Sequence, residues 1–374
     1  MRAAILALSA KTYGGDSYIR SLVPALEKYG QEMEFILFVQ DECYKSLCSD
    51  NGNVEIHLCK FPLSSFGPAL LFWEQLILPK YLLRFNVDVV YTAKNQTLFF
   101  SSHPCVISIR NMWPFRTVPF KTPILMKVRH FLLKRLTDLS LPKAKRVIAV
   151  SRFVFNNLIS RGVVPQKIDV IPHGIDDIQE TLAENGQDKI FEGKFVASSG
   201  KFIPYSNLKT LVRAFCKLKS MGYEGDFLFA GGSCDGNYEV EVKALVRELK
   251  MESHIKFLGY VSRIQVLAMM KNCDAFLFTS TLEACPFTLL EAMKTGTPII
   301  ASNADPMPEF CGDAAVIVDP NDADAFAAAA YEVVSSKELQ ESLKLKGKCR
   351  AEEFTWERSI KKLVTVLDRA ACEY

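Results

Sequence analysis

The chain has 374 residues, 49% of them hydrophobic and 23% charged, a composition typical of a soluble globular protein and a length that predicts two domains. Its eleven cysteines form no CxxC pair and no Cys/His cluster, which argues against a disulfide framework or a zinc site. The net charge of +3 is uneven: residues 1–180 carry 22 lysines and arginines against 15 acids, and the rest carry 23 against 27. The first half therefore favours an anionic partner more than the second half does.

The chain begins with an apolar run at residues 3–8, followed by a loop, Gly14-Gly15 and a helix that extends to Tyr29. We interpret the run as the first strand rather than a secretory signal. No stretch approaches the ~18 uninterrupted apolar residues of a transmembrane helix. Adjacent glycines let the backbone approach a ligand closely, although such a pair on its own is usually a turn.

The remaining first half alternates apolar runs with helical patterns. Strands are predicted at residues 35–39, 54–58, 87–91, 105–109 and 147–150, and helices at 68–85, interrupted at Pro79, and 152–160. We expect the apolar helix around Trp73 to pack on the sheet. The alternative is a helix that touches a membrane beside an acceptor site.

Residues 115–152 form a basic stretch with a single acid, Asp138. Its cations are Arg116, Lys121, Lys127, Arg129, Lys134, Arg135, Lys143, Lys145, Arg146 and Arg152. Apolar residues interleave with them and predict an amphipathic helix, which can lie on anionic lipid with about 1 kcal/mol from each cation near the surface. The alternative is a solvated basic face over a buried apolar stripe. Nucleic acid is not an expected partner, since no recognised binding motif accompanies the charge.

The second half is again an alternation of strands and helices. Strands are predicted at residues 194–198, 227–230, 255–258, 275–278, from 297 and at 316–320, and helices at 208–221, 239–250, 287–295, from about 325 to 345 and at the C-terminus to Ala371. Asp322 is predicted to cap the helix near Ala325 rather than to bind a metal with Asp324.

Residues 274–303 predict a strand, a loop, a short helix and a second strand, that is, a βαβ unit. Pro286 opens the helix and Gly296 ends it. Because that helix starts beyond the carboxyl ends of the strands, its first free amides, at residues 287–289, and its dipole suit a diphosphate.

Two glutamates frame this expected anion site. A carboxylate beside a phosphate is unfavourable unless it accepts hydrogen bonds, and sugar hydroxyls are the obvious donors. We therefore interpret Glu291 as a ligand of ribose and Glu283 as a ligand of a transferred sugar.

The string Glu283-x7-Glu291-Ala292-Met293, followed by Gly296-Thr297-Pro298, resembles the donor motif of glycosyltransferase family four. Further likenesses follow in order, including Val-Ile-Pro-His-Gly-Ile-Asp at residues 170–176. The resemblance implies an α/β fold of two Rossmann-like domains facing a deep cleft, the GT-B architecture. The implied parts are an acceptor domain at residues 1–177, a linker at 178–193, a donor domain at 194–353 and a helix at 354–374 that returns to the first domain.

The resemblance also implies site residues. Those with a catalytic role are Glu283, Lys201 and Arg110. Those that bind the donor are Gly14, Gly15, Gly200, Ser206, Tyr260, Val261, Phe287, Thr288, Leu289 and Glu291, while Asn111 and His173 belong to the acceptor side. No metal and no cofactor other than the nucleotide sugar are expected.

Two positions depart from the family pattern. Many members have a histidine near the transferred sugar where this chain has Arg110, and arginine cannot act as a general base at physiological pH. Arg110 can stabilise a departing phosphate or, alternatively, pair with a nearby carboxylate. Members also carry a second phosphate cation where this chain has Ser206.

The resemblance implies a retaining, metal-independent transferase that moves a hexose from a nucleotide-diphosphate sugar to a saccharide or lipid-linked acceptor in surface polysaccharide biosynthesis, such as that of lipopolysaccharide. Bacterial members often use lipid-linked acceptors, which favours a cytoplasmic protein that lies peripherally on the anionic inner face of the cell membrane through residues 115–152. The alternative is a nucleotide-sugar-binding or scaffold protein of the same fold, motivated by Ser206 and Arg110. A nucleotide-sugar epimerase is disfavoured.

Overall fold

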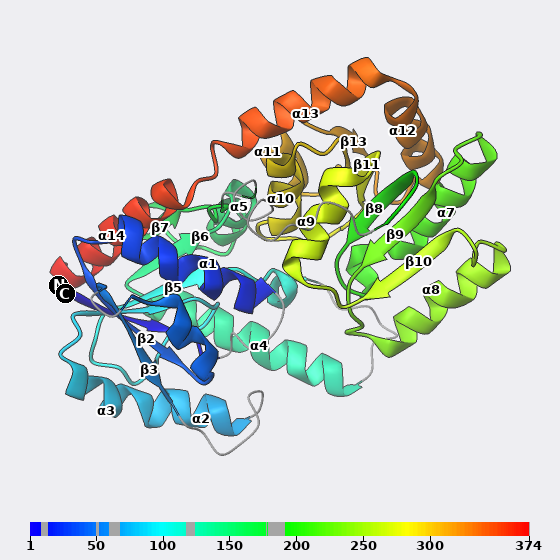
Figure 1. The fold of residues 1–374 in the computed structure, drawn as a ribbon. Coiled ribbons are helices and arrows are strands. Elements are labelled where there is room, and N and C mark those ends of the chain that lie inside the picture. The colour runs from blue at the N-terminus through cyan, green and yellow to red at the C-terminus, as the bar shows by residue number, and fades with distance from the viewer. Residues whose placement is uncertain are drawn as a thin grey trace. The chain divides into compact units, whose positions relative to one another are not determined.

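The structure is a computed structural model that describes residues 1–8, 14–49, 52–59, 68–116, 124–176, 178 and 191–373. The chain divides into two compact units, Met1–Gly174 with Thr355–Tyr374, and Ile175–Phe354. Each unit is a parallel sheet with helices on its faces (Figure 1), so the predicted α/β fold with two Rossmann-like domains is confirmed. Of the predicted linker, residues 179–190 lie outside the described residues.

The first unit contains a seven-stranded sheet in the order β3-β2-β1-β4-β5-β6-β7. Its strands are β1 (Arg2–Leu6), β2 (Glu34–Val39), β3 (Val54–Leu58), β4 (Val89–Thr92), β5 (Cys105–Ile109), β6 (Arg146–Ala149) and β7 (Ile168–Val170). Every pair is parallel; Ala3, for example, faces Phe35 on one side and Val89 on the other. Strand order reverses between β1 and β4, and the carboxyl edge at such a reversal is where open α/β sheets bind ligands.

The helices of this unit are α1 (Gly14–Tyr29), α2 (Pro68–Leu76), α3 (Leu78–Leu82), α4 (Ile124–Lys143), α5 (Arg152–Ser160) and α14 (Trp356–Cys372). Short 3₁₀ helices are η1 (Glu42–Leu47), η2 (Leu83–Phe85), η3 (Trp113–Phe115) and η4 (Pro165–Lys167). The predicted helix at 68–85 breaks at Ile77, because Pro79 has no amide hydrogen to donate to the preceding turn.

Helices cover both faces of the first sheet. Trp73 of α2 and Leu78 and Leu82 of α3 pack against Leu6 and Phe38, as predicted for the helix around Trp73. α14 lies on the other face beside α1 and against β4 (Figure 1). Its buried apolar side chains are Trp356, Ile360, Leu363, Val364, Val366 and Leu367. The segment before the second unit meets this helix so closely that a Cβ at Gly174 would lie 2.3 Å from the Trp356 nitrogen.

The second unit contains a six-stranded parallel sheet in the order β10-β9-β8-β11-β12-β13. Its strands are β8 (Phe195–Ser199), β9 (Asp226–Ala230), β10 (Ile255–Gly259), β11 (Ala275–Phe278), β12 (Ile299–Ser302) and β13 (Val316–Val318). Its helices are η5 (Pro204–Ser206), α7 (Leu208–Ser220), α8 (Gly236–Glu248), α9 (Arg263–Asn272), α10 (Phe287–Thr295), α11 (Met307–Cys311), α12 (Ala323–Ser335) and α13 (Lys337–Ala351). Strand order reverses between β8 and β11.

The second sheet separates two apolar cores. Alternate residues of β8 show this: Val196 packs with α7, α8 and α12, whereas Phe195 and Ala197 pack with α9, α10 and α11. Both faces of the central strands are therefore buried, which explains their continuous apolar runs. The predicted cap is confirmed, since Asp322 accepts a 2.9 Å hydrogen bond from the Ala325 amide.

Candidate functional site

The predicted donor residues of the second unit follow two neighbouring strands at the point where strand order reverses. Gly200 and Lys201 come directly after β8, and the segment with Glu283 comes after β11. The two segments are joined: Thr279 Oγ1 donates to the Ser206 carbonyl at 2.9 Å, and the Thr281 amide donates to the Tyr205 carbonyl at 2.8 Å. These hydrogen bonds thus tie the two segments together at the carboxyl edge of the sheet, the edge at which open α/β sheets bind ligands.

A close backbone approach shapes the start of the Gly200 loop. The Gly200 amide donates to the Ala230 carbonyl at 3.0 Å, and a Cβ at Gly231 would lie only 1.7 Å from the Gly200 carbonyl oxygen. Position 231 therefore admits glycine alone. Ser206 lies beside Gly200, with its Oγ 3.9 Å from where a Gly200 Cβ would stand.

Glu283 is the strongly perturbed carboxyl of this site. Its Oε1 accepts a 2.8 Å hydrogen bond from Ser280 Oγ. Burial raises the pKa of the Glu283 carboxyl to about 7, although the Ser280 hydrogen bond and the charge of Lys201 oppose that shift. Lys201 is therefore a neighbour of Glu283, and near neutral pH the carboxyl is present in both its protonated and its ionised form.

Glu291 belongs to an ion-pair network. Arg263, the first residue of α9, donates from Nε to Glu291 Oε1 and from Nη1 to Asp176 Oδ2, each at 2.8 Å. The Glu291 side chain is only 12% exposed. Burial raises the pKa of its carboxyl, and the positive charge of Arg263 opposes this. One carboxylate oxygen of Glu291 is thus held by Arg263, which fixes the orientation of the other.

The amides at the start of α10 correct one prediction. We expected those of Phe287, Thr288 and Leu289 to be free, but the Phe287 amide donates to the Cys285 carbonyl and the Leu289 amide to the Pro286 carbonyl, each at 3.0 Å. The reason is the backbone of Pro286 (φ −78°, ψ 85°), which forms a tight inverse γ-turn and a 3₁₀-like first turn. Among the described residues, no backbone acceptor lies on the Thr288 amide.

Tyr260 and Val261 follow β10 in the same unit. Tyr260 is 80% exposed. The next residue, Ser262, caps α9 by accepting from the Gln265 amide, and the Gln265 side chain accepts in return from the Ser262 amide. This reciprocal cap fixes the start of α9 and hence the position of Arg263.

In the first unit, Gly14 and Gly15 form the first turn of α1. The loop at residues 9–13, which we predicted to precede them near a ligand, lies outside the described residues.

Arg110 follows β5 and stacks on an aromatic ring. Its guanidinium carbon lies 3.4 Å from the centre of the Tyr18 ring, and its Nε donates to His173 Nε2 at 3.3 Å. Among the described residues, its recorded side-chain partners are the Tyr18 ring, His173 and the Ala93 carbonyl, and none is the carboxylate that the predicted alternative requires. Its charge is held by a ring face and by neutral acceptors.

His173 and Asn111 have internal partners. His173 is 7% exposed, and burial followed by the charge of Arg110 holds the pKa of its ring well below the usual value. His173 is therefore neutral and accepts from Arg110, so its proton sits on Nδ1. Asn111 Oδ1 accepts from the Trp113 amide at 2.9 Å, and the Arg110 amide donates to Asn95 Oδ1 at 3.1 Å.

Sequence reasoning missed Arg263, Asp176 and Asn95 as parts of these sites. The capping-box pattern Ser262-x-x-Gln265 could have located the start of α9 and with it Arg263. The sequence positions of Asn95 and Asp176 do not predict their partners, Arg110 and Arg263, because these are distant in the sequence.

The described residues contain no group of three histidine, cysteine, aspartate or glutamate side chains arranged to hold a metal ion. They also contain no helix with the length and apolar character needed to span a bilayer.

Two family models match the chain in tandem. The model for Glycosyltransferase Family 4 matches residues 13–178, and the model for Glycosyl transferases group 1 matches residues 181–350. Together they cover nearly all of both units.

Proteins of similar sequence are named as glycosyltransferases. An O-antigen chain mannosyltransferase B from Escherichia coli is 33% identical over 113 residues, which are 30% of this chain and 30% of that protein. An N-acetylgalactosaminyltransferase from Campylobacter jejuni that acts on a diphospho-undecaprenol-linked sugar is 24% identical over 226 residues, 59% of each chain. The chain thus spans between about a third and three fifths of the length of these curated relatives.

The fold also matches solved structures. HepE of Anabaena, crystallised with UDP and glucose, is 18% identical, with a TM-score of 0.73 over 99% of this chain and all of that one. At 18% sequence identity, this structural similarity supports the GT-B fold and no more specific property. From its two tandem family matches, the chain belongs to the family-four glycosyltransferases, and its second half matches the group 1 glycosyl transferases.

Proposed function

We propose that the chain is a retaining, metal-independent glycosyltransferase that moves a hexose from a nucleotide-diphosphate sugar to a saccharide or lipid-linked acceptor in surface polysaccharide biosynthesis. The observation that carries this proposal is the buried carboxyl of Glu283, held by Ser280 at 2.8 Å in the loop before α10 and close enough to Lys201 to feel its charge. The relatives named for O-antigen mannose transfer and for transfer to a diphospho-undecaprenol-linked sugar support the acceptor class.

In this proposal the leaving diphosphate is bound by Lys201, by the Thr288 amide and by the positive end of the α10 dipole. A fully ionised Glu283 would repel that diphosphate, but a carboxyl with a pKa of about 7 accepts a proton as the anion binds. Protonated Glu283 can then donate to the sugar or phosphate and still accept from Ser280. This resolves how an acid can lie beside a phosphate site.

Glu291 would hold the ribose hydroxyls with the oxygen that Arg263 leaves free. Arg110, held on the Tyr18 ring, would stabilise charge on the departing phosphate. No role requires a metal ion, since cations and helix amides supply the positive charge.

The test is a transfer and hydrolysis assay against UDP-, GDP- and ADP-sugars, with calorimetry on the same panel. We expect turnover with at least one donor, unchanged activity in EDTA, and retention of the anomeric configuration by NMR. Inverted product would contradict the retaining mechanism, and loss of activity in EDTA that added metal restores would contradict metal independence.

The second candidate is a nucleotide-sugar-binding protein without turnover. Ser206 favours it, because this residue brings no charge and its carbonyl is occupied by Thr279. Calorimetric binding without transfer or hydrolysis for any donor would identify this function. Binding together with turnover would exclude it.

We further propose that α4 lies on the anionic inner face of the cell membrane, with the chain in the cytoplasm. The side of the helix that packs on the protein includes Thr137 and Ser140, which are fully buried, and His130 and Leu141, which are 7% and 4% exposed. Its outward stripe repeats at helical spacing and consists of Ile124 (76% exposed), Val128 (48%), Phe131 (54%), Leu132 (54%) and Leu139 (60%). This exposed stripe is what a membrane-facing helix requires, whereas the expected alternative has its apolar stripe buried beneath a basic face.

Cations flank this stripe, including Lys127, Arg129, Lys134 and Arg135. An exposed apolar stripe bordered by cations matches the chemistry of an anionic lipid surface, where apolar side chains enter the acyl boundary and the cations meet the head groups. A protein partner would not need the basic border.

Sedimentation with vesicles tests this surface. The protein should bind vesicles that contain phosphatidylglycerol, bind less at high salt, and bind poorly to pure phosphatidylcholine. Phe131→Ser with Leu132→Ser should abolish binding, whereas Leu345→Ser, at a leucine that is 67% exposed in the second unit, should not. Equal binding by both variants would contradict the assignment.

A further inference from the structure

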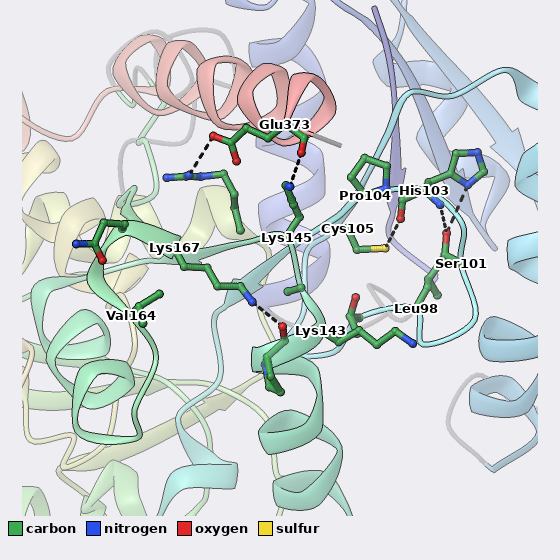
Figure 2. Close-up of a pocket in the computed structure, with 15 residues that line it drawn as sticks. Leu98, Ser101, His103, Pro104, Cys105, Lys143, Lys145, Val164, Lys167 and Glu373 are labelled. Carbon is green, nitrogen blue, oxygen red and sulfur yellow. Dashed lines mark hydrogen bonds and ion pairs between the residues drawn. The ribbon is translucent and has the colours of Figure 1, made fainter.

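A basic cavity lies at the amino edge of the first sheet, the edge opposite to Arg110. Its volume is about 630 Å³, and it forms where α4 ends and where the chain enters β5, β6 and β7. The charged side chains that line it are Lys143, Lys145, Arg146, Lys167 and Glu373 (Figure 2). Four cations against one acid leave an excess of positive charge in a concave surface.

Among the carboxylates of the described residues, partners are recorded for only one of these cations, Arg146. Arg146 Nε donates to Asp169 Oδ2 at 2.8 Å, and its Nη1 lies 3.9 Å from Glu373 Oε1. Lys145 instead donates to the backbone carbonyl of Glu373 at 2.6 Å, and Lys167 donates to the backbone carbonyl of Pro142 at 2.7 Å (Figure 2).

A carbonyl oxygen is neutral, so it orients an ammonium group without cancelling its charge. Each ammonium has three hydrogens to donate. Burial, followed by the charge of Lys145, lowers the pKa of Lys167, which means that the two amino groups repel one another across this cavity. An anion between them would replace that repulsion with attraction.

We propose that this cavity binds a phosphate group with two negative charges, held by Lys145 and Lys167 with Lys143 at the rim. A phosphate group has several acceptor oxygens, and these suit the ammonium hydrogens that the two carbonyls leave over. The proposal concerns a second anion site, separate from the donor site of the other unit, and does not depend on transfer activity.

Two sources of this phosphate fit the surroundings. One is a soluble phosphorylated compound. The other is the head group of an anionic lipid, because the outward stripe of α4 ends at Leu139, shortly before Pro142 and Lys143, which line the cavity. Only the second source rests on the proposed membrane surface.

Histidine signals provide a local readout. The chain has five histidines, and His103 lines the cavity, so NMR of histidine-labelled protein, with His103 assigned by His103→Gln, reports on this site and not on the donor site. Inorganic phosphate, added at constant ionic strength and pH 8, should shift the His103 signals in a saturable manner. Lys145→Gln with Lys167→Gln should weaken the apparent affinity about tenfold or more.

Lys80→Gln is the matched control for each single variant, because it removes one positive charge from an exposed lysine of α3 that lies outside the cavity. If the double variant fails to fold, the single variants Lys145→Gln and Lys167→Gln replace it, and each should weaken binding. Lys145→Arg and Lys167→Arg keep the positive charge and should retain binding. In the lipid arm, sedimentation with phosphatidylglycerol vesicles should fall in the double variant and not in Lys80→Gln.

A saturable His103 shift supports a soluble source, and a selective loss of vesicle binding supports a lipid source. The proposal is overturned if phosphate produces no saturable shift and the variants bind vesicles equally. It is also overturned if the double variant responds to phosphate and vesicles as Lys80→Gln does.

Discussion

Arg263 Nε donates to Glu291 Oε1 at 2.8 Å, and this pair decides how the proposed ribose ligand is presented. Nη1 of the same guanidinium donates to Asp176 Oδ2 at 2.8 Å. One side chain at the start of α9 therefore holds both α10, which carries Glu291, and the segment that opens the second unit. Only arginine offers two such donors in one rigid plane.

Replacing Arg263 with methionine should raise the donor KM about tenfold or more and change kcat less, because Glu291 would lose its orientation and its compensating charge. Lysine should restore only part of the affinity. Arg247→Met, at an exposed arginine of α8, is the control and should leave both constants unchanged. An Arg263→Met enzyme with normal donor KM would separate this pair from donor binding.

Glu283 should make stability depend on pH. Burial raises the pKa of its carboxyl from about 4.5 in the unfolded chain to about 7, so the folded chain binds more protons between these values. The free energy of unfolding then decreases as pH rises from about 4.5 to 7, by at most about 3 kcal/mol from this group. Denaturant unfolding of Glu283→Gln and the parent protein at pH 5 and pH 8 should show the variant gaining relative stability at pH 8. A pH-independent difference would exclude the raised pKa.

Arg110→Met should lower kcat about a hundredfold with a smaller change in donor KM, because the proposed cation acts mainly on charge that develops in the transition state. Arg84→Met, at an exposed arginine of the same unit, should be neutral. Steady-state kinetics measure both, and an equal change in the two variants would argue for a general charge effect.

His173 should act as a positioning residue for Arg110. Since its ring stays neutral, His173 should contribute no step to the pH profile of kcat. The parent protein and His173→Gln should therefore have pH profiles of the same shape. Glutamine keeps an acceptor oxygen and should retain most of the activity, whereas leucine should lose more of it. If His173→Leu and His173→Gln lose activity equally, the hydrogen bond to Arg110 is not what matters.

Gly174→Ala should destabilise the protein by about 3 kcal/mol, because the new methyl group would collide with the backbone of Trp356, which cannot move aside as a side chain can. Gly236→Ala is the control: no atom of the described residues lies within 4 Å of a Cβ added there, so the change should stay within about 0.5 kcal/mol. Urea denaturation measures both.

Most elements were predictable from sequence because their signals are local. Buried parallel strands such as β11 read as short apolar runs, and Pro286 and Gly296 mark the limits of α10, which the structure reproduces. The strand β7 was missed because it has only three residues, and α9 because its pattern offers little helical contrast.

The candidate sites were less predictable, because they depend on partners far apart in the sequence. Arg263 and Glu291 are 28 residues apart, and Arg110 and His173 are 63 apart. The backbone geometry of Pro286 also leads the Phe287 and Leu289 amides to donate to nearby carbonyls, whereas the general rule for helix N-termini leaves them free. For α4 the sequence predicted an amphipathic helix but left two orientations open, since composition gives the residues of a helix but not which side packs on the protein.

The helix α14 has a consequence for how the protein is made. Its apolar side chains cover α1 and β4, yet it is synthesised after the whole of the second unit. During translation the second unit can fold while part of the first sheet is still exposed, because α14 has not yet left the ribosome. A nascent chain arrested before residue 356 should therefore expose that face and attract chaperones.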